Sequence, residues 1–143
     1  MLYIDFLKTL DHCPFCADPA QGVVKENEHA VLKCALAPYA PYHLLAIPKR
    51  HLEDFLDLTR DERAAIDDLI ADAARMFESM GLADYSVMVR NGDKKKVGKS
   101  IDHVHFHVVP EARLGTIDAN GDDRAILSPE DMSRITDMIR KKI

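Results

Sequence analysis

The chain has 143 residues, a formal net charge of −5 at pH 7 and 47% hydrophobic residues. This length fits a single domain spanning residues 1–143, and the acidic balance provides no general attraction to nucleic acid or to an anionic membrane. No apolar run reaches the ~20 residues of a membrane helix, and the N-terminus lacks a signal-peptide pattern. We therefore expect a cytoplasmic protein without nucleic-acid or membrane partners.

The first half of the chain is typical of short strands separated by turns. Val23 and Val24 precede a polar segment at residues 26–28, and an apolar segment at residues 30–32 follows it, which is the pattern of two strands around a turn. Pro38, Pro41 and Pro48 then bracket His43 and the apolar residues 44–47. Because proline interrupts regular structure, this segment is predicted to be a short strand.

Two helices are predicted, and each has a recognisable start. Thr59 is a good N-cap, and Glu62, three residues later, completes a capping box. Apolar residues then recur at three- and four-residue steps until Gly81, which ends the helix. The last helix is predicted to begin at Ser128, with Pro129 in its first turn.

Two further strands are predicted at residues 85–89 and 101–109, with a turn at Asn91-Gly92 after the first of them. The strands cluster together, and helices do not alternate with them along the chain. This order of elements predicts an α+β fold with an antiparallel sheet and two main helices.

A Gly-Lys-Ser sequence at residues 98–100 resembles part of a phosphate-binding Walker loop. That pattern requires four residues between its first glycine and Gly-Lys-Ser, whereas five residues separate Gly92 from Gly98. A strand pattern follows Ser100, where a Walker loop would open a helix, so the Walker interpretation fails. Gly98, Lys99 and Ser100 still provide backbone and side-chain donors beside three further lysines, and this loop can bind phosphate in another geometry.

Three histidines occupy alternate positions in the stretch that follows. Because successive side chains of a strand point to opposite faces, His103, His105 and His107 are predicted to share one face, while Val104 and Val108 pack on the other. A solvated row without function would not need three imidazoles in strict alternation. Two hypotheses remain open from the residues alone: a metal site built from the three rings, and nucleophilic catalysis by one neutral imidazole.

The cysteines indicate a metal site more than a disulfide framework. The chain contains three, and Cys13 and Cys16 form a Cys-Pro-Phe-Cys sequence that is typical of one half of a zinc site. A redox pair or two unbound thiols are the alternatives. Cys34 lies in an apolar stretch and is expected to be a small buried hydrophobic residue.

The motif His-Val-His-Phe-His-Val-Val resembles the signature of the histidine-triad (HIT) superfamily of nucleotide hydrolases and transferases. The similarity extends to residues 38–51, to the Asp-Leu-Thr-Arg-Asp-Glu-Arg segment and to the Asn-Gly and Gly-Lys-Ser segments, in order over residues 13–110. The resemblance implies a five-stranded antiparallel sheet with two main helices, and a homodimer. It also implies that His105 attacks an α-phosphate and forms a covalent nucleotidyl-histidine, with a nucleoside phosphoramidate or dinucleoside polyphosphate as substrate.

The resemblance assigns further roles around His105. His107 matches the triad member that organises the phosphate and leaving group, and His43 the upstream histidine of the same site. Ser100 matches a hydroxyl donor, and Asn91 a phosphate-contacting asparagine.

Two positions depart from the family pattern. Lys99 stands where an amide is usual, and Ala35 where a carboxylate or amide bonds ribose hydroxyls. These departures put the nucleoside part of the substrate in question and leave a catalytically altered nucleotide-binding protein as an alternative.

Family members with the N-terminal cysteine pair bind a structural zinc ion. The resemblance carries this set to Cys13, Cys16, His51 and His103. A closed set of two cysteines and two histidines leaves no open coordination position, so this zinc would stabilise the fold and would not react with substrate.

Overall fold

The computed structural model of the chain describes residues 1–113 and 123–143. Five strands form one antiparallel sheet in the order β1-β2-β3-β5-β4. The strands are β1 (Val23–Glu26), β2 (Ala30–Cys34), β3 (Leu44–Pro48), β4 (Tyr85–Val89) and β5 (Phe106–Pro110). The predicted α+β fold with a five-stranded antiparallel sheet is confirmed.

Two long helices, α3 (Arg60–Ser79) and α6 (Pro129–Arg140), are the two main helices that the sequence predicts. Shorter helices are α1 (Tyr3–Lys8), α2 (Pro14–Ala17) and α4 (Lys94–Val97), and η1 (Phe55–Asp57) is a single 3-10 turn. None of these short helices is predicted from the sequence. A helix of four to six residues contains too few positions to show a helical repeat of apolar side chains.

The capping box of α3 forms as predicted. Glu62 N donates to Thr59 Oγ1 over 3.1 Å, and Thr59 N donates to the Glu62 carboxylate over 3.0 Å. Gly81 has a φ of 78°, the left-handed conformation that ends the helix. The Glu62 carboxylate also accepts two hydrogen bonds from Arg50, which joins the start of α3 to the loop after β3.

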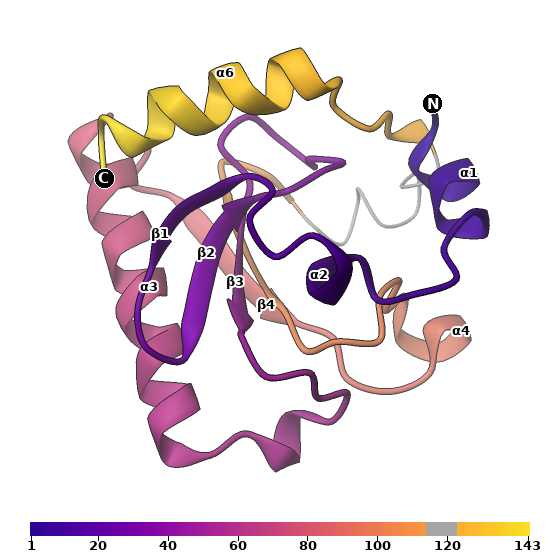
Figure 1. Cartoon of the computed structure of the whole chain (residues 1–143). Helices are drawn as coiled ribbons and strands as arrows, with labels where there is room; N and C mark the ends of the chain where they lie inside the picture. Colours follow the sequence, from indigo (N-terminus) through magenta and orange to yellow (C-terminus); the bar gives the residue numbers. More distant parts are fainter. Residues whose placement is uncertain (114–122) are drawn as a thin grey trace.

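The sheet has two differently covered faces (Figure 1). Helices α3 and α6 cover one face, and the largest core side chains gather there, including Leu32, Leu44, Phe77, Val108 and Ile139. The other face carries a smaller apolar cluster in which Phe15 of α2 packs against Ala35, Leu45 and Ile47. Because α2 is short, this second face is left with room for a cavity.

The histidine strand is shorter than the sequence predicts. Residues 101–109 were expected to form one strand, but β5 begins only at Phe106, so His103 and His105 precede it. The backbone N–H of Val104 donates to Leu52 O, in the loop after β3, which draws this segment away from the sheet ladder. The predicted division of faces still holds, since Val104 and Val108 pack in the main core.

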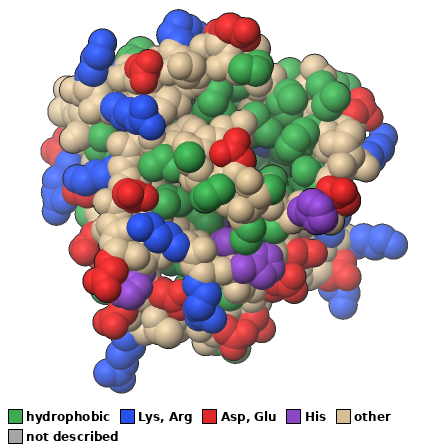
Figure 2. Space-filling model, viewed as in Figure 1, with side chains coloured by type: hydrophobic (Ala, Val, Ile, Leu, Met, Phe, Trp, Pro, Cys, Tyr) green, Lys and Arg blue, Asp and Glu red, His purple; other side chains and the backbone are tan. Residues whose placement is uncertain are grey.

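The molecular surface seen in Figure 2 carries hydrophobic side chains around α2 and towards α1, with charged side chains around them. In residues 1–113 and 123–143, no helix has both the length and the apolar content needed to cross a membrane. Cys34 is 3% exposed, which confirms its predicted burial in the core.

Candidate active site and metal centre

A cavity lies on the sheet face that α2 partly covers. Its enclosed volume is about 70 Å³, and its mouth is open to solvent. His43 at the start of β3 and His105 and His107 around the start of β5 all line this cavity. Its apolar lining includes Pro14, Phe15, Leu36 and Leu45. The structure thus brings together three of the histidines that the sequence predicts as catalytic.

The imidazole of His105 is held in one orientation by the backbone. Its Nδ1 lies 2.7 Å from His103 O, and because a carbonyl only accepts, Nδ1 carries the proton. Nε2 of the neutral ring is then left with a free lone pair. Burial lowers the pKa of His105 to about 4, so the ring is uncharged at pH 7. This is the state required of a nucleophile.

A second chain of hydrogen bonds fixes the tautomers of the other two rings. The backbone N–H of Tyr39 donates to His43 Nδ1 over 3.1 Å, so the proton of the neutral His43 ring is on Nε2. His43 Nε2 lies 3.0 Å from His107 Nδ1, which must accept. The proton of the neutral His107 ring is therefore on Nε2. Burial lowers the pKa of His43 to about 3 and that of His107 well below its ordinary value, so neither ring is charged at pH 7.

Phe15 of α2 lies over the sheet and against His103 and His105. Its ring meets those of His103 and His105 nearly edge-on, with centroid separations of 5.6 and 5.4 Å. The same ring lies 5.6 Å from the Nζ of Lys33, a residue of β2 that also lines the cavity. Neither Phe15 nor Lys33 is predicted from the sequence as a site residue, because only the strand register places Lys33 on the histidine face.

Ser100 and Gly98 line a neighbouring cavity and not the one that contains His105. Tyr3 and Arg124 line both cavities and stand between them. The hydroxyl groups of Tyr3 and Ser100 are 2.9 Å apart, and the Arg124 guanidinium stacks on the rings of Tyr3 and Tyr39. Tyr3 and Arg124 were also not predicted, since they lie far from the histidine motif in sequence.

The structure does not bring Lys99 and Asn91 to the histidine cavity. Lys99 is 4% exposed, and its Nζ donates to Glu53 O over 2.6 Å. The side-chain oxygen of Asn91 accepts from the backbone N–H of Phe55 over 2.8 Å. Both residues thus tie the Gly-Lys-Ser segment and the end of β4 to the loop at residues 53–55.

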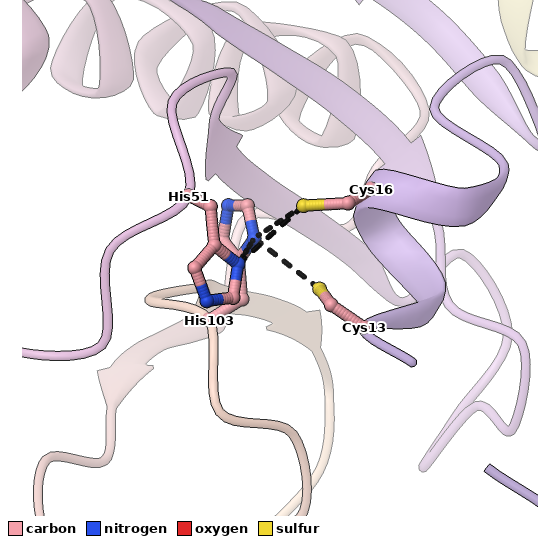
Figure 3. Close-up of side chains that lie close together, drawn as sticks. All are labelled: Cys13, Cys16, His51 and His103. Atoms are coloured by element: carbon pink, nitrogen blue, oxygen red, sulfur yellow. Dashed lines mark hydrogen bonds between the residues drawn. The ribbon is translucent and has the colours of Figure 1, made fainter. Parts of the chain in front are cut away.

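Cys13, Cys16, His51 and His103 form a cluster that can hold a metal ion (Figure 3). The ligand atoms of all four lie within 4.8 Å of one another. Cys13 Sγ and His51 Nδ1 lie 3.4 and 3.2 Å from His103 Nδ1, and Cys16 Sγ lies 3.4 Å from His51 Nδ1. Zinc bonds of about 2.0–2.3 Å in a tetrahedron give separations of this size. The donor set therefore fits a zinc ion.

The outer nitrogens of both histidine ligands also have suitable partners. His103 Nε2 lies 2.8 Å from Pro48 O, so it carries the proton and leaves Nδ1 free to bind a metal ion. His51 Nε2 lies 3.5 Å from the carboxylate of Glu53. Partners of this kind orient metal-binding imidazoles in proteins.

The histidine motif is divided between two tasks. His103 directs Nδ1 at the cysteines, whereas His105 and His107 direct their Nδ1 atoms at His103 O and at His43. Because the three rings face three different partners, they do not coordinate one metal ion together. The geometry therefore favours the nucleophilic hypothesis for the middle histidine over the metal hypothesis for all three.

Together these features define a small α+β protein with a histidine-lined cavity beside a metal centre. A family model described as the HIT domain matches residues 18–114. The chain belongs to this family, as the sequence resemblance implied. Its members bind nucleotides and are typically nucleotide hydrolases.

Individual relatives agree with this membership. The Protein hit of Bacillus subtilis is 30% identical over 149 aligned positions, which cover 93% of this chain and 95% of that protein. The adenosine 5′-monophosphoramidase HINT3 of Mus musculus is 32% identical over 104 positions, covering 68% of this chain and 62% of that protein. A crystal structure of a Zn-bound histidine triad family protein from Mycobacterium smegmatis has a TM-score of 0.69 at 24% identity, covering 91% of each chain.

Proposed function

We propose that this protein cleaves the bond between the α-phosphate of a nucleotide and its leaving group, through a covalent nucleotidyl intermediate on His105. The observation that carries the proposal is the 2.7 Å bond from His105 Nδ1 to His103 O in a ring that lines the cavity. This bond aims an unprotonated Nε2 away from the backbone. Nucleoside phosphoramidates and dinucleoside polyphosphates are the substrate classes, the first in keeping with the monophosphoramidase name of the mouse relative.

The reaction has two steps. The Nε2 lone pair of His105 forms a bond to the α-phosphorus while the bond from phosphorus to the leaving group breaks. In the second step a water molecule attacks the same phosphorus, the N–P bond breaks, and the nucleoside monophosphate is released. His103 O accepts from Nδ1 throughout, and it stabilises the positive charge that develops on the ring during the first step.

His107 serves as a hydrogen-bond donor to the leaving group in this proposal. Its Nε2–H is fixed because Nδ1 accepts from His43, and it can donate to the leaving atom while that atom departs and takes a proton from solvent. The attacking water loses its proton to solvent in the second step. His43 is then a positioning residue that acts through His107.

The Gly-Lys-Ser segment supports the phosphates from the neighbouring cavity. Ser100 and Gly98 line that cavity, and Ser100 reaches a substrate phosphate when its hydroxyl exchanges the bond to Tyr3 for one to the ligand. Direct phosphate contacts by Lys99 and Asn91, as the sequence predicts, require that these side chains give up their bonds to Glu53 O and Phe55 N.

We assign Cys13, Cys16, His51 and His103 to a structural zinc ion. When bound, zinc would supply a fixed link between α2, the loop after β3 and the segment before β5. Beside the metal centre, the chain itself holds Phe15 of α2 against His105. Rigid placement of α2 thus keeps one wall of the cavity in position.

We also infer a homodimer that pairs through β4, in keeping with the family resemblance. This strand is an edge of the sheet, and its Tyr85 and Val87 are each 45% exposed. Sedimentation should show a dimer that Val87→Lys weakens. Val97→Lys, a change of a similarly exposed residue on α4, is the matched control and should leave the dimer intact.

Steady-state turnover of a substrate panel tests the proposed reaction. Wild-type protein should release a nucleoside monophosphate from a phosphoramidate or a dinucleoside polyphosphate, and His105→Ala should abolish release while the thermal transition is retained. His12→Ala, a change of an exposed histidine, controls for loss of an imidazole. Equal turnover by wild type and His105→Ala would refute the assignment.

A further inference from the structure

Lys33, Leu45 and His107 stand side by side across three adjacent strands. Lys33 of β2 pairs with Leu45 of β3, and Leu45 pairs with His107 of β5. Directly paired residues point to the same face of a sheet, and adjacent strands lie about 4.8 Å apart. Lys33 and His107 therefore line the same face, separated by the width of one strand.

The ammonium of Lys33 is buried with little compensation from the protein. Lys33 is 4% exposed, and its Nζ donates to Asp18 O over a long 3.3 Å. Among the ion pairs formed by residues 1–113 and 123–143, none includes Lys33. An ammonium carries three donors, and a buried charge is unfavourable unless acceptors surround it. The group thus retains hydrogen-bonding capacity for a ligand.

The cavity wall between Lys33 and the histidines is apolar. Phe15 packs on Leu45, and the centroid of its ring lies 5.4 Å from that of His105 and 5.6 Å from the Lys33 ammonium. Pro14 and Leu36 add further apolar lining. A planar base can pack against Phe15 with its phosphate at His105 and its far edge at Lys33.

We propose that Lys33 determines base specificity and selects guanine over adenine. The inference rests on the proposed function, because it places the transferred nucleotide between His105 and Lys33. Guanine presents the adjacent acceptors O6 and N7, which lysine commonly recognises, whereas adenine places an amino donor at the position of O6. An ammonium meets an acceptor in the first case and another donor in the second.

Ala35 is consistent with recognition at the base end of the substrate. It lines the cavity two residues after Lys33, and its methyl side chain forms no hydrogen bond to ribose hydroxyls. Lys33 is one of the polar side chains that line this cavity, together with Gln21 and Arg124. A 2′-deoxyribose substrate should react nearly as well as the ribose form.

Paired substrates test the role of Lys33. We expect wild-type kcat/KM to be about tenfold or more higher for guanosine 5′-monophosphoramidate than for the adenosine compound. Lys33→Met keeps an unbranched chain without the ammonium and should bring the ratio close to one. Lys33→Gln carries both a donor and an acceptor and should also reduce the ratio. Lys25→Met is the matched control. Lys25 pairs with Asp72, and it lines neither the histidine cavity nor the neighbouring cavity that contains Ser100.

Binding of the monophosphates separates this inference from the proposed reaction. Calorimetry with GMP and AMP on the same variants should show tighter GMP binding that Lys33→Met abolishes. If neither phosphoramidate reacts but this binding preference is found, the role of Lys33 stands and the proposed reaction fails. The inference would be overturned if folded Lys33→Met kept the wild-type guanine-to-adenine ratio. It would also be overturned if wild-type protein bound neither GMP nor AMP.

Discussion

His43 and His107 are joined ring to ring, with Nε2 of His43 3.0 Å from Nδ1 of His107. The backbone N–H of Tyr39 fixes the other side of His43, so a main-chain donor determines, through two imidazoles, which nitrogen of His107 holds its proton. The ring of His43 also stacks on that of Tyr39, with ring centroids 5.2 Å apart. A residue outside the triad motif thereby controls the protonation of one inside it.

This relationship predicts a dependence on the leaving group. His107→Ala removes the hydrogen-bond donor to the leaving group, so the loss of kcat/KM should be about 10²-fold or more for an alkylamine, whose departing nitrogen needs that bond. The loss should be small for 4-nitrophenol, which leaves as an anion. The measurement is kcat/KM for both compounds with wild type and variant. An equal loss for both leaving groups would contradict hydrogen-bond donation by His107 to the leaving group.

The metal centre predicts a specific effect of the cysteines. Wild-type protein should contain about one zinc ion per chain, and Cys16→Ser should lose it because a thiolate ligand is missing. The free energy of unfolding should fall by about 2 kcal/mol or more, since the metal binds the folded state alone. Metal analysis and chemical denaturation provide the two values. Cys34→Ala, which changes the buried cysteine outside the cluster, should retain the zinc.

The pair formed by Glu62 and Arg50 predicts how stability varies with pH. Two hydrogen bonds from Arg50, with support from Thr59, lower the pKa of Glu62 from its ordinary 4.5 to about 2. Because the folded-state pKa is depressed, the carboxylate stabilises the fold above pH 4.5, and this contribution is lost as the pH falls towards 2. The carboxylate of Glu62 is only 6% exposed but the Arg50 side chain is 52% exposed, so solvent screens the pair and the contribution at neutral pH should be about 1 kcal/mol.

Glu62→Gln isolates this contribution, because glutamine keeps the capping box but not the charge. The difference in unfolding free energy between wild type and variant should be largest at pH 6 and should vanish near pH 2. Glu78→Gln, near the exposed end of α3, controls for the loss of one negative charge. A difference that stays constant from pH 6 to pH 2 would show that the charge of Glu62 is not its source.

The long elements of the fold could be predicted from the sequence because their signals are local. The capping box at Thr59 and the apolar repeat up to Gly81 define α3 within one stretch of chain, and Ser128 and Pro129 do the same for α6. Alternation of His103, His105 and His107 with valine and phenylalanine also identified the shared face. The start of β5 could not be predicted, because it depends on the hydrogen bond from Val104 to Leu52 O across the fold.

The rest of the candidate site depends on contacts between distant segments. Lys33 reaches the histidine face only through the register of β2, β3 and β5, and no local pattern marks it. Tyr3 meets Ser100 from the N-terminus. For Lys99 the local sequence and the structure differ. Its position beside Gly98 predicts a phosphate contact, whereas its buried ammonium donates to Glu53 O in the structure.

The most direct test is a search for the covalent intermediate on His105. Wild-type protein is mixed with a reactive nucleotide substrate and quenched in alkaline denaturant within one turnover, because N–P bonds are labile in acid. Intact-mass spectrometry should show the addition of one nucleotidyl group, and peptide mapping should locate it on His105. An unmodified protein during rapid turnover, or an adduct that persists in His105→Ala, would contradict the proposed mechanism.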